Sequence, residues 1–152
     1  MKQGKYIITE NTALTSCMFR MKLKGDTSAI TAPGQFINIQ LNGFYLRRPI
    51  SVCDVSDDEI TIIYKLVGKG TKAMSELECG KELDILTGLG NGYDISEAGD
   101  EPLLAGGGAG VPPMYLLAKK LREAGKKVTV ILGFNTKEEI FYEEEFKALG
   151  CE

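Results

Sequence analysis

Three segments combine basic, hydroxyl and glycine residues in patterns suited to binding phosphate groups. They are Arg47–Ser51, Gly68–Thr71 and Gly106–Pro113. A guanidinium binds phosphate oxygens in a bidentate way, glycines let the backbone approach a phosphate closely, and free amides at a helix start attract its charge. The first two segments lie among alternating strands and could clamp one dinucleotide. The third follows an apolar strand and opens a helix, so the order predicts a second dinucleotide site and electron transfer between two cofactors.

The third segment has the clearest physical logic. Gly108, Gly110 and Pro113 form a G-x-G-x-x-P pattern, and proline suits a first helical turn because its missing N–H costs nothing there. The third glycine of the dinucleotide fingerprint is absent. A plain glycine turn is the alternative, but the preceding strand and following helix favour a phosphate site.

The other two segments are weaker signals when taken alone. Gly68, Gly70 and Thr71 would free the backbone before a helix, but they lack the spacing of a nucleotide triphosphatase loop. Arg48 is a candidate phosphate clamp, and its alternative is a solvated arginine at a strand end. Pro49 indicates an edge position, because proline cannot donate a hydrogen bond within a sheet.

Composition narrows the remaining chemistry. The 152 residues include 18 basic and 21 acidic side chains, a net charge of -3 that favours neither nucleic-acid nor membrane binding. Histidine is absent, which removes catalytic triads of the Ser-His-Asp type and histidine-ligated zinc. The cysteines at positions 17, 53, 79 and 151 are too widely spaced for a close-pair metal motif. We expect no metal site and a cytoplasmic location, with the hard chemistry supplied by a cofactor.

Hydrophobic periodicity predicts two domains. Period-two alternation over residues 17–24, 36–41 and 59–65, with shorter strands at 6–9, 50–53 and 83–86, predicts a six-stranded antiparallel Greek-key barrel over residues 1–98. In residues 17–24, Met18 falls on the solvent face of this pattern. A short helix over residues 71–78, with Thr71 as its N-cap, interrupts the strands.

The pattern of predicted elements changes after residue 98. Strands at 103–105 and 128–134 alternate with helices at 113–124 and 138–149, which predicts a partial Rossmann-like parallel α/β domain over residues 99–152. Two strand-helix units leave a strand edge and apolar helix faces uncovered. We therefore expect the chain to be a fragment of a longer protein.

Several motifs in order resemble the ferredoxin reductase superfamily, and within it the electron transfer subunits of class 1B dihydroorotate dehydrogenase. The resemblance spans essentially the whole chain. It is carried by the runs Leu46–Ser51, Ile62–Lys65, Gly68–Thr71, Gly88–Gly92 and Gly106–Pro113. Several motifs in the family's order are far more specific than any one of them alone.

This resemblance implies a role for each matched residue. Arg48, Pro49, Ile50 and Ser51 correspond to the FAD-binding strand, with Arg48 on the phosphates and Ser51 near the reactive flavin nitrogen. Ile63, Tyr64 and Lys65 correspond to the second FAD-contacting strand. Gly70 and Thr71 correspond to the pyrophosphate loop, and Gly108, Gly110 and Pro113 correspond to the NAD(P)H motif.

The resemblance also implies a reaction and a partner. Members of the family pass hydride equivalents between NAD(H) and FAD, coupled through a 2Fe-2S cluster to an FMN-containing catalytic subunit that oxidises dihydroorotate in pyrimidine biosynthesis. The four cysteines that hold the cluster in relatives lie beyond the point matched by Glu152, so the cluster is expected only there. No arginine follows Gly133–Thr136, which favours NADH, although Lys137 weakens the preference. A flavin-dependent NAD(P)H, ferredoxin or sulfide reductase subunit and a non-catalytic flavin-binding module are the alternatives.

Overall fold

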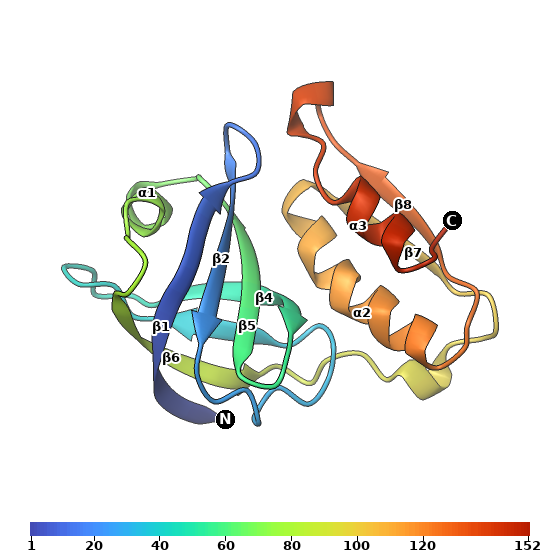
Figure 1. The fold of residues 1–152 in the computed structure, drawn as a ribbon, viewed down its shortest axis with the longest axis horizontal. Coiled ribbons are helices and arrows are strands. Elements are labelled where there is room, and N and C mark those ends of the chain that lie inside the picture. Colours follow the sequence, from blue (N-terminus) through green and yellow to red (C-terminus); the bar gives the residue numbers. More distant parts are fainter.

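A computed structural model describes all residues 1–152 and shows a barrel followed by a smaller α/β unit (Figure 1). One short helix, α1 (Lys69–Ser75), interrupts the strands of the barrel. The barrel strands are β1 (Lys2–Ala13), β2 (Met18–Lys24), β3 (Phe36–Ile39), β4 (Arg48–Val55), β5 (Glu59–Lys65) and β6 (Glu82–Leu89).

The six strands close into an antiparallel barrel in the order β1-β2-β5-β4-β3-β6. Strands β3, β4 and β5 are consecutive neighbours and β2 lies beside β5, which is a Greek-key connection. Alternate residues fill the interior, as the period-two pattern predicts. Met21, Leu23, Ile60 and Ile62, for example, belong to a cluster of 15 buried residues in the barrel. The predicted barrel is therefore confirmed.

The second unit is a βαβ arrangement with a two-stranded parallel sheet. Residues Leu103–Leu104–Ala105 pair in register with Thr129–Val130–Ile131. The elements are η1 (Ile95–Glu97), β7 (Leu103–Gly107), η2 (Gly108–Gly110), α2 (Val111–Glu123), β8 (Thr129–Gly133), η3 (Lys137–Glu139) and α3 (Glu143–Ala148).

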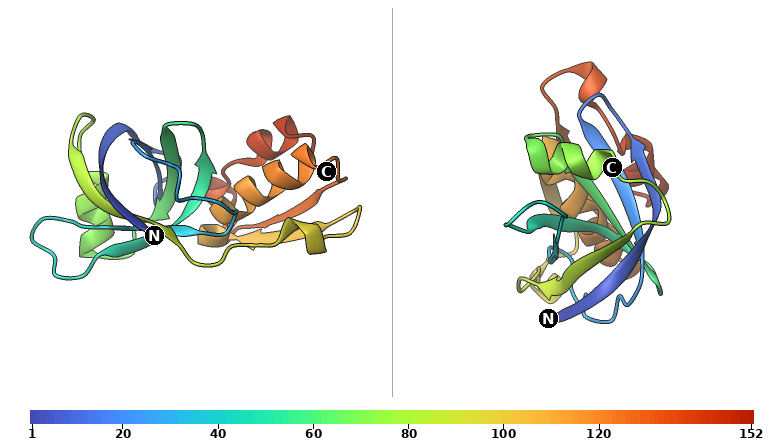
Figure 2. Two further views of the ribbon diagram at one scale, coloured as in Figure 1. Left: turned by 90° about the horizontal axis from the view of Figure 1, so that it is seen from below. Right: turned by 90° about the vertical axis from the view of Figure 1, so that its left-hand side faces the viewer.

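The two units share a hydrophobic cluster, and Figure 2 shows them lying side by side. Met18, Cys53 and Ile63 point out of the barrel and are buried in one cluster with residues of α2 and α3. Beside them, the Lys119 ammonium of α2 lies 2.8 Å from the Asp54 carboxylate of β4. The expectation that Met18 faces solvent is therefore wrong, because the second unit covers that outer face of the barrel.

The predicted helix over residues 138–149 is also wrong in its extent. A 3-10 turn, η3, and the short helix α3 replace it, with Tyr142 between them in a left-handed conformation at φ 67°. Consecutive helical side chains diverge by about 100°, whereas Phe141 and Tyr142 are both buried in the shared cluster. The left-handed residue Tyr142 therefore separates η3 from α3, and both aromatic side chains at this break pack into the shared cluster. No helix in the structure is both long and apolar enough to cross a membrane.

Candidate functional site

A cavity of about 400 Å³ opens where β4, β5 and α1 meet the glycine-rich turn of the second unit. Of the residues that the family resemblance assigns to FAD binding, it brings together all except Gly70. The lining residues are Arg48, Pro49, Ile50, Ser51, Ile63, Tyr64, Lys65, Val67, Thr71 and Ala109.

The cavity exists because β4 and β5 stop pairing at this point. Their ladder runs from Val55 and Ile60 to Val52 and Ile62, with a register shift next to Val52. The preceding residues of β4 pair with β3 instead, where Pro49 lies opposite Asn38. Proline has no N–H to donate toward β5. The two strands therefore separate and leave their side chains facing an open space.

Arg48 lies against Gly70, which is buried in the first turn of α1. A Cβ atom at Gly70 would come within 2.1 Å of the Arg48 Nε atom. The Arg48 Cζ atom also lies 4.9 Å from the centre of the Phe44 ring, a cation–π distance, and its guanidinium donates to the Leu46 carbonyl. Gly70 thus shapes the cavity without lining it, by leaving room for the guanidinium.

The cavity is electrostatically positive. Arg48 and Lys65 both line it, no acidic residue does, and neither cation forms an ion pair. Tyr64 adds a neutral group, because burial raises the pKa of its phenol, which donates a hydrogen bond of 2.9 Å to Asn11 Oδ1. The site therefore offers uncompensated positive charge and suits an anionic ligand.

Thr71 has a different local role from the one expected. Helix α1 begins at Lys69 with Gly68 as its N-cap, so Thr71 is the third residue of the helix and the N-cap prediction is wrong. Its Oγ1 atom accepts hydrogen bonds from the backbone amides of Val67, at 2.9 Å, and Gly68, at 3.2 Å. The Thr71 hydroxyl therefore fixes the loop that enters α1.

A second cavity, of about 510 Å³, lies at the carboxyl ends of β7 and β8. In open α/β sheets, ligands bind at this end of the strands. Lys65 and Ala109 line both cavities, so the two adjoin. The residues that line the second cavity are Lys65, Gly107, Gly108, Ala109, Gly133, Phe134, Asn135 and Glu139.

Residues of the glycine-rich turn have two different roles: some line a cavity, and others support the packing of helix α2. Gly108, at φ 49°, lines the second cavity, whereas Gly110 and Pro113 line neither cavity. Gly110 is the N-cap of α2 and Pro113 lies in its first turn. A Cβ atom at Gly106 would lie 2.9 Å from the Gly110 carbonyl oxygen, so Gly106 serves close packing.

Sequence reasoning missed several lining residues. Val67 is 76% exposed, and a large apolar residue in a polar turn is a signal that could have identified it. Glu139 lies shortly after β8, the second parallel strand. Ligands of open α/β sheets bind at the carboxyl ends of the strands, so this position could have been identified from the sequence. Another cavity, of about 310 Å³ beside β8 and α3, contains none of the predicted site residues.

Two solved structures that superpose on the chain are named as a ferredoxin-NADP oxidoreductase and a ferredoxin reductase. No family model matches the chain. An NADH-dependent reduced ferredoxin-NADP oxidoreductase superposes with a TM-score of 0.86 and 31% identity, over 96% of this chain and 54% of that one. The ferredoxin reductase of carbazole 1,9a-dioxygenase gives 0.85 and 24%, over 96% and 46%. The chain thus has the fold of these ferredoxin reductase structures.

Curated relatives narrow this class. The chain is 44% identical to the electron transfer subunit of dihydroorotate dehydrogenase B (NAD(+)) from Fusobacterium nucleatum, and 42% identical to that from Bacillus pumilus, over 99% of its length in both cases. It spans about 61% of the length of these relatives. Over the residues it shares with them, the chain is similar in sequence to the electron transfer subunits of dihydroorotate dehydrogenase B, which confirms the resemblance seen in its motifs.

Proposed function

We propose that this chain holds FAD in the cavity beside Arg48 and receives the nicotinamide dinucleotide in the adjoining cavity, as part of an electron transfer subunit. The observation that carries this proposal is the sharing of Lys65 and Ala109 by the two cavities. Two ligands that exchange a hydride must lie in contact. The adjoining sites satisfy that requirement within one chain.

The residues present fit the diphosphate of FAD. The Arg48 guanidinium lies at the cavity wall without an ion-pair partner, and Gly70 lacks the side chain that would displace it. Bidentate pairing of arginine with phosphate is among the strongest hydrogen-bonded contacts in proteins. Lys65 adds a second positive charge. Both groups are in place without a carboxylate to compete for them.

The other lining residues would orient the flavin. FAD, when bound, supplies the two-electron chemistry, so no side chain of this chain needs to act as an acid or base. By the family resemblance, Ser51 would lie near the reactive flavin nitrogen, and Ile63, Tyr64 and Lys65 would belong to the second strand that contacts FAD. Ile50 and Ile63 present apolar surface to the cavity, which would limit the access of water.

The second cavity would hold the nicotinamide dinucleotide. Gly108, in the turn after β7, lets the backbone approach the pyrophosphate, and Gly110 and Pro113 form the helix start behind it. No arginine lines this cavity, whereas Glu139 does. A carboxylate there disfavours the extra phosphate of NADPH, so we propose NAD(H) as the dinucleotide.

We propose the FMN-containing, dihydroorotate-oxidising catalytic subunit as the partner, in a cytoplasmic step of pyrimidine biosynthesis. The names of the relatives support only the dihydroorotate dehydrogenase part of this assignment; FMN and the pathway come from the family resemblance. No group of three or more His, Cys, Asp or Glu side chains is placed to hold a metal ion in this chain. By the family resemblance, the 2Fe-2S cluster would lie in the part of the longer relatives that this chain does not cover.

The test is FAD binding by the purified chain, followed by anaerobic addition of NADH. We expect a yellow protein that releases FAD on denaturation, and an Arg48→Ala variant whose FAD affinity falls about tenfold to 100-fold, the value of one charge-assisted hydrogen bond. Lys72→Ala is the matched control, because Lys72 is an exposed cation of the same region that does not line the cavity. Failure of the wild-type chain to bind FAD would contradict the proposal.

A second candidate is a subunit of a flavin-dependent NAD(P)H or ferredoxin reductase. The likeness at 31% identity to an NADH-dependent reduced ferredoxin-NADP oxidoreductase favours it. Coupling NADH oxidation to ferredoxin, compared with coupling to a dihydroorotate dehydrogenase catalytic subunit, separates the two readings. A non-catalytic flavin-binding module would show no bleaching of the flavin with NADH in either case.

A further inference from the structure

We infer that Arg47 is a positioning residue for the flavin site, because its ion pair with Asp84 on the outer wall of the barrel anchors the loop that presents Arg48 to the cavity. This inference rests on the proposed FAD site. Arg47 and Arg48 are neighbours in sequence but have different surroundings. Arg47 contacts β3 and β6, whereas Arg48 contacts Phe44 and α1.

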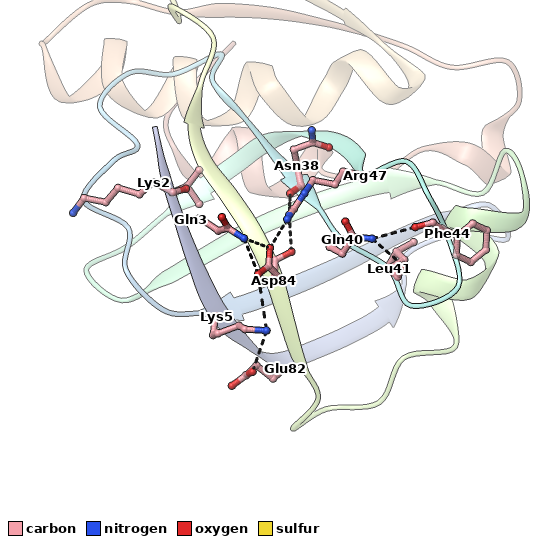
Figure 3. Close-up of polar contacts among 11 residues, drawn as sticks. Lys2, Gln3, Lys5, Asn38, Gln40, Leu41, Phe44, Arg47, Glu82 and Asp84 are labelled. Carbon is pink, nitrogen blue, oxygen red and sulfur yellow. Dashed lines mark hydrogen bonds and ion pairs between the residues drawn. The ribbon is translucent and has the colours of Figure 1, made fainter.

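Arg47 is bound at several points, and Figure 3 shows these contacts. Its Nη2 atom lies 2.6 Å from Asp84 Oδ1, and its Nη1 atom donates to the backbone carbonyls of Asp84, at 3.2 Å, and Asn38, at 3.3 Å. Strand β3 lies between β4 and β6 in the barrel. The Arg47 side chain therefore crosses one strand and ties the start of β4 to the next.

Asp84 is itself held in place. The Gln3 Nε2 atom donates to both of its carboxylate oxygens, at 3.0 Å and 2.9 Å (Figure 3). The Lys5 ammonium lies more distantly, at 4.0 Å. The Arg47 guanidinium and the Gln3 amide hold the pKa of Asp84 below its usual range. A carboxylate fixed from β1 as well as β4 makes a rigid anchor.

The far end of the loop is tied as well. The Gln40 side-chain amide donates to the backbone carbonyls of Leu41, at 3.3 Å, and Phe44, at 3.1 Å. Phe44 is the residue whose ring lies against the Arg48 guanidinium. With Gln40 at one end and Arg47 at the other, the loop holds both Arg48 and the ring on which it rests.

The geometry of an extended chain explains why the two arginines divide their tasks. Successive side chains of a strand point to opposite faces. With the Arg47 side chain, which is 22% exposed, fixed on the outer wall, the Arg48 side chain is directed toward Gly70 and the cavity. Without the Arg47 contacts, the start of β4 would lose its tie to β6, and Arg48 would spend less time in the binding orientation.

An ion pair on the surface can stabilise the fold without affecting ligand binding. The test therefore needs a readout that a purely structural role would not change. Affinities for FAD and riboflavin, measured by flavin fluorescence on the 152-residue chain, provide it. Riboflavin lacks the phosphates that Arg48 is proposed to bind. We expect Arg47→Ala to weaken FAD binding by about tenfold and to leave riboflavin affinity unchanged, while Arg47→Lys restores part of the loss.

Lys5→Ala is the matched control, since it removes a cation near the same carboxylate without touching the loop. We expect it to change neither affinity. If Arg47→Ala does not fold, as judged by thermal unfolding, Asp84→Asn removes the ion pair with almost no change in shape and should show the same selective loss. Equal losses for FAD and riboflavin, or no loss, would overturn the positioning role. If the wild-type chain binds no FAD, the proposed function itself fails.

Discussion

Replacing Gly70 by alanine should separate the stability of this protein from its ability to bind FAD. The Gly70 φ angle is not in the left-handed region, so alanine fits the backbone of α1. The new Cβ atom would lie 2.1 Å from Arg48 Nε and 2.5 Å from Arg48 Nη2. These atoms are the far end of a flexible side chain, so Arg48 can move aside while the barrel stays intact.

The two effects have opposite signs. Alanine is favoured over glycine within a helix by up to about 1 kcal/mol, so the folding free energy should be unchanged or slightly improved. Displacing Arg48 removes a charge-assisted hydrogen bond to the diphosphate, worth about 1.5–3 kcal/mol. That loss corresponds to a Kd for FAD about tenfold to 100-fold higher.

Urea unfolding and flavin fluorescence titration measure the two quantities on the same sample. Gly68→Ala is the matched control, since a Cβ atom at Gly68 would meet nothing within 4 Å and its φ of -176° is ordinary extended backbone. We expect this control to bind FAD like the wild type. Unchanged FAD affinity in Gly70→Ala would refute the argument that Arg48 must rest against this glycine.

Other expectations follow from the shared cluster, the cysteines and the anchor of Arg47. Met18→Ala should lower the free energy of unfolding by about 2–4 kcal/mol in denaturant titration, because it opens a void where the two units meet. In the native protein a thiol reagent should modify exposed Cys79 quickly and Cys53 only on unfolding, because Cys53 is buried and burial raises its pKa. Titration of Asp84 should not change FAD affinity between about pH 5 and 8. The pKa of Asp84 is lowered in the folded state, so its ionised form contributes stability above the unfolded-state pKa near 3.9. That stability is lost only as the pH falls through the folded-state pKa. A fall in affinity with a midpoint near pH 6 would contradict this assignment.

The sequence predicted the barrel because its strands obey simple alternation. Met21, Leu23, Ile60 and Ile62 point inward as their spacing indicates. Alternation also assigns the other face to solvent, and that assumption fails where another unit covers it. Ile63 is buried on the outer face of the barrel for this reason, and no local pattern distinguishes such a face from the interior.

Motif order grouped residues that the structure brings together, but it did not give their geometry. Arg48 and Lys65, for example, both line one cavity. Motif order did not show that Gly110 supports α2 without lining a cavity, since cap and ligand positions favour the same residue type. The helical pattern also did not indicate the interruption at Tyr142. Tyr142 has a left-handed conformation and packs against residues distant in sequence, and a local pattern does not contain those contacts.

Met18, Cys53 and Ile63 belong to the barrel but are buried against the second unit. The boundary between the two units along the sequence is therefore not the boundary of their packing. An engineer who grafts this barrel onto a foreign nucleotide-binding module at the connection near residue 98 would leave three apolar side chains without cover. A successful chimera must carry a matching α2 surface, or replace those three positions with polar residues. Recombination between such reductases is therefore constrained by side chains far upstream of any junction.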